Sequence, residues 1–372
     1  MKKTIIFLTT LCLCFHMFTA SLCAAPPISA KSAVVIDAAT GRILFEQDAH
    51  TRRGMASTTK IMTALIALES LDEQTVVEVD PRACGIEGSS VYLSPGEKIT
   101  VETLLYALML QSANDAAAAL AYAVADSIEE FAARMNEKAD ALGLLATHFE
   151  NPHGLDGETH YTTAYELALI TAKALENERF AQIVATEKKA VPLHNGTATR
   201  LLVNHNRLLR EYDDIIGVKT GFTQKCGRTL VSAAQRNGVR LICVTLNDAN
   251  DWEDHRQLLD YGFSLYEEKQ LAQIGEFSYE VPVCGGTSSS VTVSNTQSLS
   301  LWLPQACETI VTVTELPRFL YADIQKGDAI GQIVFYADEK KLGTLPLYAQ
   351  ESVNVQKQDK GFWRKLFPFL LK

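Results

Sequence analysis

The stretch Ser57-Thr58-Thr59-Lys60-Ile61-Met62-Thr63-Ala64-Leu65-Ile66-Ala67-Leu68 joins a polar tetrad to a run of mainly apolar residues. Its apolar positions recur at helical spacing, which predicts a helix with one apolar stripe: Ile61, Met62, Leu65, Ile66 and Leu68. Positions three apart lie on one helix face, so Ser57 and Lys60 would meet at the start of that helix. A serine hydroxyl needs such a base to act as a nucleophile at neutral pH. Alternatively, the tetrad merely caps a surface helix.

A second motif, Ser112-Ala113-Asn114, follows an apolar segment that is predicted to be helical. It stands where this helix breaks before an Ala-rich one begins, so both polar side chains can point into a cleft. Ser112 could relay a proton from Lys60 to a leaving amine, and Asn114 could hold both a substrate amide and Lys60. The alternative is a plain helix break in which Asn114 or Asp115 serves as the N-cap.

The third motif, Lys219-Thr220-Gly221, follows the strand pattern of residues 215–218. A lysine ammonium beside a hydroxyl suits the terminal carboxylate of a substrate. Gly221 would let a substrate backbone approach closely. The backbone N–H groups of Phe222 and Ser57 could together form an oxyanion hole. The alternative is that Lys219 is an ordinary charge at the edge of a sheet.

The third motif also bears on the protonation of Lys60. A lysine acts as a base only when it is neutral, and both burial and a nearby cation lower the pKa of its amine. Lys219 supplies that cation if the first and third motifs line one cleft. The order, spacing and setting of the three motifs therefore predict an active-site serine enzyme.

The composition describes an exported globular protein. The chain has 372 residues, 47% of them apolar and 21% charged, which suits two domains. Its net charge of −10, without a long basic run, argues against nucleic acid as a partner. Lys2 and Lys3, the apolar core of residues 5–18 and the small residues at Cys23-Ala24-Ala25 predict a secretory signal peptide over residues 1–24. An uncut anchor is the alternative.

Cysteine and histidine give no sign of a metal site. Cleavage of the leader would leave five cysteines at irregular spacing and without a C-x-x-C pair: Cys84, Cys226, Cys243, Cys284 and Cys307. An odd number without a regular pattern indicates neither a disulfide framework nor a zinc site. The histidines are scattered and form no H-E-x-x-H motif, which disfavours a zinc peptidase. We expect no metal or organic cofactor.

The element order predicts one sheet flanked by a helical lobe. Short strands are expected first, with a hairpin signal at Ala38-Ala39-Thr40-Gly41, and strands return after Lys219. Between them we expect helices over residues 104–110, 116–124, 128–142 and 165–175, the last opened by a capping box at Thr163 and Glu166. Strands over residues 229–234 and 239–246 and a helix over 252–266 would complete a first domain, residues 25–275. Val-, Thr- and Ser-rich runs predict a small β-domain over residues 276–355.

These residues resemble those of low-molecular-mass penicillin-binding proteins, the serine-type D-alanyl-D-alanine carboxypeptidases. The resemblance rests on the motifs and on the blocks around them: Met55–Lys60, Glu87–Ser90, Leu104–Ala116, Asn151–Leu155 and Gly217–Thr223. It implies an α+β fold, with a β-lactamase/penicillin-binding-protein-like sheet and helical lobe followed by a small all-β domain. It also implies hydrolysis of the terminal D-Ala-D-Ala bond of peptidoglycan stem peptides through a Ser57 acyl-enzyme, and acylation by penicillin and other β-lactams.

By the same resemblance, the catalytic residues would be Ser57, Lys60, Ser112 and Asn114. Substrate would be bound by Lys219, Thr220, Gly221 and Phe222. The chain departs from the family in some places: Phe222 stands where many members have His or Tyr, and Cys226 lies unusually close to the site. An arginine that supports the carboxylate pocket in some members is missing near the last helix, where Arg256 is an uncertain substitute.

Two rival readings follow from the same motifs. A class A β-lactamase shares them but deacylates through a glutamate and a water molecule. The E-x-x-L-N segment that would carry this glutamate is absent, since the nearest match, Glu166-Leu-Ala-Leu-Ile170, ends in Ile. A catalytically silent peptidoglycan-binding module would predict a broken set of polar groups, and none is broken.

The C-terminus, residues 356–372, reads as a polar linker followed by an amphipathic segment. Apolar residues recur at helical spacing, at Phe362, Trp363, Leu366, Phe367 and Leu370. The amphipathic segment, residues 361–372, has roughly 12 residues, which are too few to span a bilayer, since a spanning helix needs about 20. They could instead lie in the membrane interface with their basic residues near anionic lipid. We therefore expect the enzyme at the outer face of the cytoplasmic membrane, or in the cell wall or periplasm. A frayed terminus packed on the β-domain is the alternative.

Overall fold

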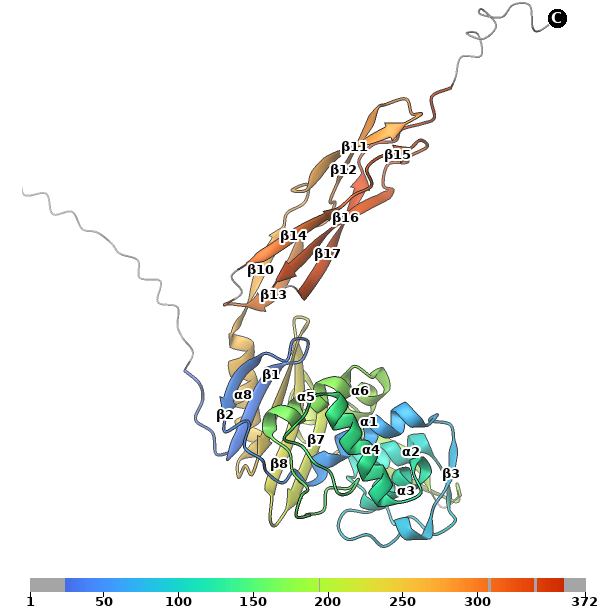
Figure 1. Cartoon of the computed structure of the whole chain (residues 1–372), viewed down its shortest axis with the longest axis vertical. Helices are drawn as coiled ribbons and strands as arrows, with labels where there is room; N and C mark the ends of the chain where they lie inside the picture. The colour runs from blue at the N-terminus through green and yellow to red at the C-terminus, as the bar shows by residue number, and fades with distance from the viewer. Residues whose placement is uncertain (1–23, 194, 307–308, 338–339, 358–372) are drawn as a thin grey trace, which may run out of the picture.

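A five-stranded antiparallel sheet forms the centre of the N-terminal part (Figure 1). The computed structural model describes residues 24–193, 195–306, 309–337 and 340–357. The strand order is β2-β1-β9-β8-β7. The strands are β1 (Ser32–Asp37), β2 (Ile43–Gln47), β7 (Ile215–Thr223), β8 (Gly227–Arg236) and β9 (Val239–Leu246). Because β1 pairs with β9, the sheet joins the beginning of the described chain to a segment beyond the helices.

Alternate residues along the strands pack into two different hydrophobic cores, because successive side chains of a strand point to opposite faces of the sheet. Val34 and Val244 pack into a core shared with the helical lobe. Their neighbours Val35 and Cys243 pack on the opposite face, where α8 (Asp251–Ser264) contributes Leu258. The sheet is therefore covered on both faces, and its central strand β9 is buried almost throughout.

The helical lobe consists of short helices and two small ribbons. Its helices are η1 (Ala56–Thr59), α1 (Lys60–Ser70), η2 (Pro81–Ala83), α2 (Val101–Leu110), α3 (Asn114–Val124), α4 (Ile128–Ala141), α5 (Ala164–Leu175), α6 (Glu178–Val184) and α7 (Leu208–Glu211). The ribbons pair β3 (Val76–Glu78) with β4 (Lys98–Thr100), and β5 (Lys188–Leu193) with β6 (Ala198–Val203). The helices expected from residues 104–175 are all confirmed, with small changes at their ends.

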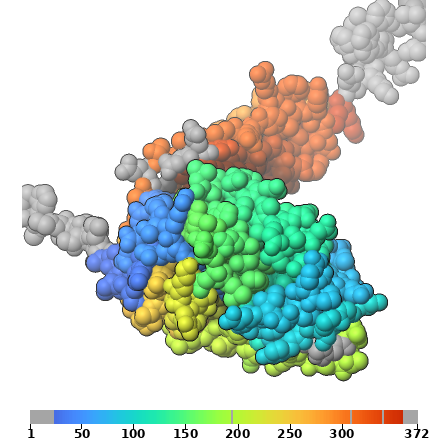
Figure 2. Space-filling view, turned by 60° about the horizontal axis from the view of Figure 1, so that its bottom comes forward, coloured from blue at the N-terminus to red at the C-terminus, as the bar shows by residue number. Residues whose placement is uncertain are grey.

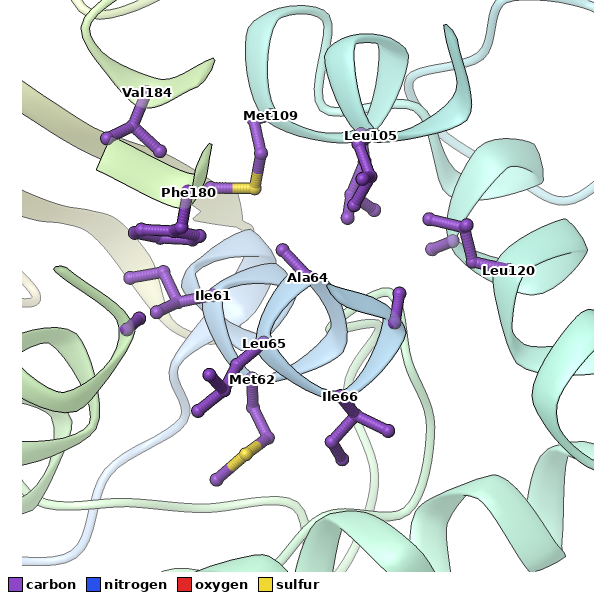
Figure 3. Close-up of a cluster of buried hydrophobic side chains, with 14 of the residues drawn as sticks. Ile61, Met62, Ala64, Leu65, Ile66, Leu105, Met109, Leu120, Phe180 and Val184 are labelled. Atoms are coloured by element: carbon purple, nitrogen blue, oxygen red, sulfur yellow. The ribbon is translucent and has the colours of Figure 1, made fainter. Parts of the chain in front are cut away.

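Residues 60–67 of helix α1 are buried all round, whereas the sequence predicted one apolar stripe. It contacts α2, α3, α4, α5 and α6. Figure 3 shows Ile61 beside Phe180, and Ala64 facing Leu105 and Met109. The small residues between the stripe positions are buried as well, because they allow neighbouring helices to approach on every side. The first residue of this helix, Lys60, is thereby placed in the interior of the protein.

Four local predictions differ from the structure. The segment around Ser57 forms the 3-10 turn η1 rather than the start of the α-helix, and Lys219-Thr220-Gly221 lies inside strand β7 rather than after it. The last helix ends at Ser264, because the chain continues as strand β10 from Tyr266. Only one of the two hydrogen bonds of the expected capping box forms at α5. The Thr163 hydroxyl accepts from the backbone N–H of Glu166, but the Glu166 carboxylate accepts from the Ala146 N–H instead of the Thr163 N–H.

The C-terminal part is all-β and projects from one end of the α+β part (Figure 1, Figure 2). Its strands are β10 (Tyr266–Ala272), β11 (Ser278–Cys284), β12 (Ser290–Ser294), β13 (Leu299–Pro304), β14 (Ile310–Glu315), β15 (Leu320–Tyr321), β16 (Ala329–Ala337) and β17 (Lys340–Ala349). They form a six-stranded sheet, β14-β16-β17-β12-β11-β15, and the pair β10-β13. By this pairing β10 belongs to the β-rich part, although it precedes residue 276.

Few polar contacts link the two parts. The hydroxyl of Tyr266 donates to the Asp37 carboxylate over 2.5 Å, and Lys340 Nζ donates to the Thr40 carbonyl over 3.1 Å. Within the described ranges, no helix has the length and apolar character needed to cross a membrane. Most of the expected signal peptide and the amphipathic tail, residues 1–23 and 358–372, lie outside the described residues.

Candidate active site

Ser57 is presented by a turn that two hydrogen bonds hold at the Met55 carbonyl. The Thr58 hydroxyl donates to the Met55 carbonyl over 2.6 Å, and Thr229 of β8 donates its hydroxyl to the same carbonyl over 3.1 Å. Ala56 adopts φ +48°, a conformation that residues with a side chain seldom take outside constrained sites. The sheet therefore holds the turn that carries the serine.

Lys60 is completely buried and makes three hydrogen bonds through its amine. Nζ donates to Ser57 Oγ over 2.9 Å and to Asn114 Oδ1 over 2.7 Å, and it also contacts the His153 carbonyl. Burial lowers the pKa of Lys60 well below its usual value, the nearby Lys219 lowers it further, and Asp115 opposes both. The structure thus joins an amine of lowered pKa directly to the serine hydroxyl.

Ser112 and Asn114 lie at the break between α2 and α3, as predicted. Ser112 is buried with φ +57°, and Asn114 begins α3. The Asn114 amide accepts from Lys60 through Oδ1 and donates to the Glu87 carbonyl through Nδ2. Asn114 therefore connects the amine to the loop before β4.

Asp115 organises that loop, a role that the sequence did not reveal. Its buried carboxylate accepts from the Ser90 hydroxyl over 2.6 Å and from the backbone N–H groups of Val91 and Leu93 over 3.2 and 3.0 Å. A buried carboxylate is stable only with such donors. The alternative reading, with Asn114 or Asp115 as the N-cap, is wrong, since Ala113 is the N-cap of α3, and the Asp115 bridge instead holds the Glu87–Ser90 block beside the site.

Lys219 is also buried, inside strand β7. Its amine donates to the Thr220 carbonyl over 2.8 Å, and burial lowers its pKa to about 7. A Cβ atom on Gly221 would overlap Thr229 Oγ1 and lie 2.9 Å from the Ser57 backbone nitrogen, so a side chain there would displace the turn that carries Ser57. Phe222, the next residue, is 64% exposed at the edge strand of the sheet.

The segment after α4 closes the site behind Lys60. Gly154 has φ +89°, and a Cβ there would overlap the Ala56 carbonyl. His160 Nδ1 accepts from the Glu150 N–H over 3.0 Å, so Nε2 carries the proton and donates to Thr59 Oγ1 over 2.8 Å. Burial lowers the pKa of His160 to about 4, which keeps the ring neutral. Sequence reasoning missed His160, because its link to Thr59 spans 101 residues.

Glu166 and Arg256, which the sequence analysis considered as possible site residues, bind partners other than the residues around Ser57. The Glu166 carboxylate accepts from the Ala146 N–H over 2.9 Å and contacts Thr147, so it serves as a structural acceptor. Arg256 binds Asp214 over 3.1 Å and Asp260 over 2.9 Å. These partners occupy its guanidinium, so Arg256 does not replace the missing arginine of the carboxylate pocket.

Taken together, the described groups can perform acyl transfer. The Ser57 hydroxyl, the Lys60 amine of lowered pKa, the Asn114 amide, the buried Lys219 amine and Gly221 lie close together. The residues come from η1, α1, the α2–α3 break and β7.

Two family models match the chain. The model described as D-alanyl-D-alanine carboxypeptidase covers residues 19–250, and the model described as penicillin-binding protein 5, C-terminal domain, covers residues 266–355. Curated relatives include the D-alanyl-D-alanine carboxypeptidase DacF of Bacillus subtilis, 32% identical over 90% of each chain. The D-alanyl-D-alanine carboxypeptidase DacA of Escherichia coli is 30% identical over 88% of this chain and 84% of its own.

Solved structures give the same result. The D-alanyl-D-alanine carboxypeptidase DacD from Francisella tularensis superposes with a TM-score of 0.62 at 26% identity, covering 90% of this chain and 95% of its own. The Streptomyces K15 DD-transpeptidase matches with a TM-score of 0.62 at 32% identity, covering 65% of this chain and 100% of its own.

We predict that Gly221→Ala slows acylation of Ser57 by benzylpenicillin at least about a hundredfold, the loss seen when an oxyanion donor is removed. The methyl group would overlap Thr229 Oγ1 and press on the Ser57 nitrogen, which would shift the proposed oxyanion donor. Gly343→Ala is the matched control, because a Cβ at this strand glycine meets Leu301 at an ordinary 3.7 Å. Acylation rates follow from intact-mass spectrometry, and an unchanged rate in folded Gly221→Ala protein would contradict the geometry.

Proposed function

The chain belongs to the D-alanyl-D-alanine carboxypeptidase family, and on this premise we propose that Ser57, Lys60, Ser112 and Asn114 carry out its reaction. As a member, it is a serine hydrolase that removes the terminal D-Ala of peptidoglycan stem peptides through an acyl-enzyme and is acylated by penicillin. The observation that carries the residue assignment is the Lys60 amine, which bonds Ser57 Oγ and Asn114 Oδ1 at once.

The proposed reaction proceeds by two acyl transfers. Lys60 takes the proton of Ser57 as Oγ attacks the carbonyl carbon of the penultimate D-Ala. The backbone N–H groups of Ser57 and Phe222 stabilise the oxyanion. When the peptide bond breaks, Ser112 passes its proton to the leaving amine of D-Ala and takes one from Lys60, which is thereby neutral again. Water then hydrolyses the ester, which frees the shortened peptide and restores Ser57.

Lys219, Thr220 and Gly221 would bind the substrate's C-terminal end. The Lys219 ammonium and the Thr220 hydroxyl are the donors proposed for the terminal carboxylate. The pKa of about 7 for Lys219 belongs to the unliganded cleft, and a bound carboxylate would favour the charged amine. Gly221 permits the close approach of the substrate backbone.

The position of Glu166 disfavours a class A β-lactamase. Its carboxylate is held by Ala146 and Thr147 rather than aimed at Ser57 with an asparagine partner. A silent binding module is disfavoured by the intact Ser57, Lys60 and Asn114 network.

We propose the domain boundaries and the cellular location of the protein from its sequence pattern. Residues 1–24 would direct export, residues 25–275 would form the catalytic domain, residues 276–355 the β-domain, and residues 356–372 the linker and membrane-surface anchor. The pairing of β10 suggests moving the domain boundary to Tyr266. The enzyme would then act outside the cytoplasm, in the cell wall or periplasm, at the outer face of the cytoplasmic membrane.

We predict that Ser57→Ala abolishes both D-Ala release and benzylpenicillin labelling, a loss of at least about a thousandfold. The direct test is mass spectrometry of the mature protein after benzylpenicillin treatment, which identifies the acylated peptide. Lys60→Arg should be nearly inert as well, because an arginine does not deprotonate. Labelling that survives in Ser57→Ala would refute the assignment of the nucleophile.

The lowered pKa values of the two lysines predict a pH profile that depends on the substrate's C-terminus. Lys219 is cationic below about 7 and loses its proton as the pH rises through that value, while Lys60 must be neutral to act. We therefore expect kcat/KM for a free-carboxylate peptide to fall above about pH 7, and the amidated peptide to lack this fall. If kcat/KM depended on pH in the same way for the two peptides, the assignment of Lys219 to the carboxylate pocket would be wrong.

The tail gives a separate prediction. Deleting Gly361–Lys372 should release the mature enzyme from anionic liposomes while carboxypeptidase activity is retained. The apolar positions would enter the interface, Arg364 and Lys365 would meet anionic lipid, and Pro368 would limit the length of the helix. Sedimentation with vesicles measures the bound fraction. Equal partitioning of the full-length and truncated proteins would contradict the anchor.

A further inference from the structure

The path of the substrate beyond the reacting bond follows from the site and rests on the proposed function. The terminal carboxylate lies at Lys219, and the reacting carbonyl lies between the Ser57 and Phe222 nitrogens. The acyl part must then extend away from Lys219 along β7, past Phe222 toward Thr223. Strand β7 is the last strand of its sheet, so its outer edge is unpaired by the sheet and can receive an extended peptide.

Asp156 lies at the end of that path. Its Oδ1 accepts from the Thr223 hydroxyl over 3.0 Å and from the Cys226 thiol over 3.0 Å. The carboxylate is exposed, and among the described residues its Oδ2 has no hydrogen-bond donor. Asp156 belongs to the segment that follows His153 and Gly154, on the other side of the cleft from β7. One oxygen thus ties the two walls together, and the other remains available.

The register places one substrate side chain near this carboxylate. An extended residue advances about 3.3 Å along a strand. The residue before the penultimate D-Ala should therefore stand level with Thr223, one position beyond Phe222. Thr223 is the residue whose hydroxyl Asp156 binds.

The surrounding charges favour a cation at this position. Residues 148–161 contain Glu150, Asp156 and Glu158 but no lysine or arginine. Glu150 is held by the Thr159 N–H and hydroxyl. The opposing cation is Lys225, and its amine donates to the Gly157 carbonyl over 3.2 Å rather than to Asp156. His153 and His160 add no charge at neutral pH, because burial lowers their pKa values to about 3 and about 4.

We propose that Asp156 is a specificity-determining residue that accepts the ammonium group on the side chain of the residue preceding D-Ala-D-Ala. The preferred substrates are accordingly peptides in which a diamino acid with a free side-chain amine occupies that position. Cys226 then has a structural part in the site: its thiol helps to fix the carboxylate, and burial together with Asp156 raises the pKa of that thiol.

The test compares two peptides that differ by one charge: Nα-acetyl-L-lysyl-D-alanyl-D-alanine with a free ε-amine, and its Nε-acetylated form. We expect the wild-type protein to favour the free amine about fivefold in kcat/KM, the upper range for a solvent-exposed ion pair. Asp156→Asn should abolish this preference, because a neutral amide has no charge for the ammonium group, whereas an asparagine oxygen still accepts from Thr223. The preference of the wild type should also shrink at high salt.

Glu158→Gln is the matched control, because it removes an equal charge from the same segment and should keep the preference. An absent preference in the wild type, its persistence in Asp156→Asn, or an equal loss in Glu158→Gln would overturn the assignment. A parallel loss on both peptides and on benzylpenicillin acylation in Asp156→Asn would show a purely structural role and would overturn it too. If the wild type cleaves neither peptide and resists penicillin, the proposed function itself fails, and the inference fails with it.

Discussion

The burial of the Lys60 amine is the constraint on which the site depends. An isolated ammonium in a protein interior is unfavourable by several kcal/mol, so such a group either loses its proton or gathers acceptors. The pKa of Lys60 is well below the ordinary value, and its amine contacts Ser57, Asn114 and His153. In its neutral form the amine donates to the carbonyl oxygens of Asn114 and His153 and turns its lone pair to the Ser57 hydroxyl, which then donates to it. These partners come from three separate segments of the chain, so the amine that we propose as the base also fixes where those segments meet.

The fold supplies that interior position through α1. A helix contacted by five others carries its first residue inward, and the small residues Ala64 and Ala67 allow the neighbours to pack closely. The sheet then contributes from the other side, since Thr229 holds the turn before Ser57 and Gly221 leaves room at its nitrogen. Because β1 pairs with β9, the beginning of the described chain and the strands after the helices form one rigid wall. The catalytic geometry is thus a consequence of how the two layers join.

The residues whose chemistry is local could be predicted from the sequence. The contact of Ser57 with Lys60, the helix break at Ser112 and the strand over residues 215–218 are patterns over a few residues, and the structure has each of them, although Ser57 lies in the 3-10 turn η1 and β7 continues to Thr223. The bridges of Asp115 and His160 could not be predicted in this way, because they join segments 22 to 101 residues apart. The burial of residues 60–67 of α1 on every side was also not predicted, because small residues such as Ala64 and Ala67 do not add to the hydrophobic periodicity of a helix. Strand β10 was missed because its charged residues, Glu267, Glu268 and Lys269, hide the alternation of a strand.

The open edge of β7 explains why the segment after α4 must lie where it does. An unpaired strand edge without protection invites pairing with other chains. Here the edge is needed free for a peptide substrate, so it cannot be covered by another strand. The segment around Gly154 and Asp156 limits access instead: Gly154 packs against the Ser57 turn, and Asp156 is tied to Thr223 at the far end of β7. This segment thus contacts the turn before Ser57 and the far end of β7, and it leaves the edge between Lys219 and Thr223 for the proposed peptide substrate. Under the proposed function, the same segment protects the strand edge and limits which peptide ends can reach the buried amine.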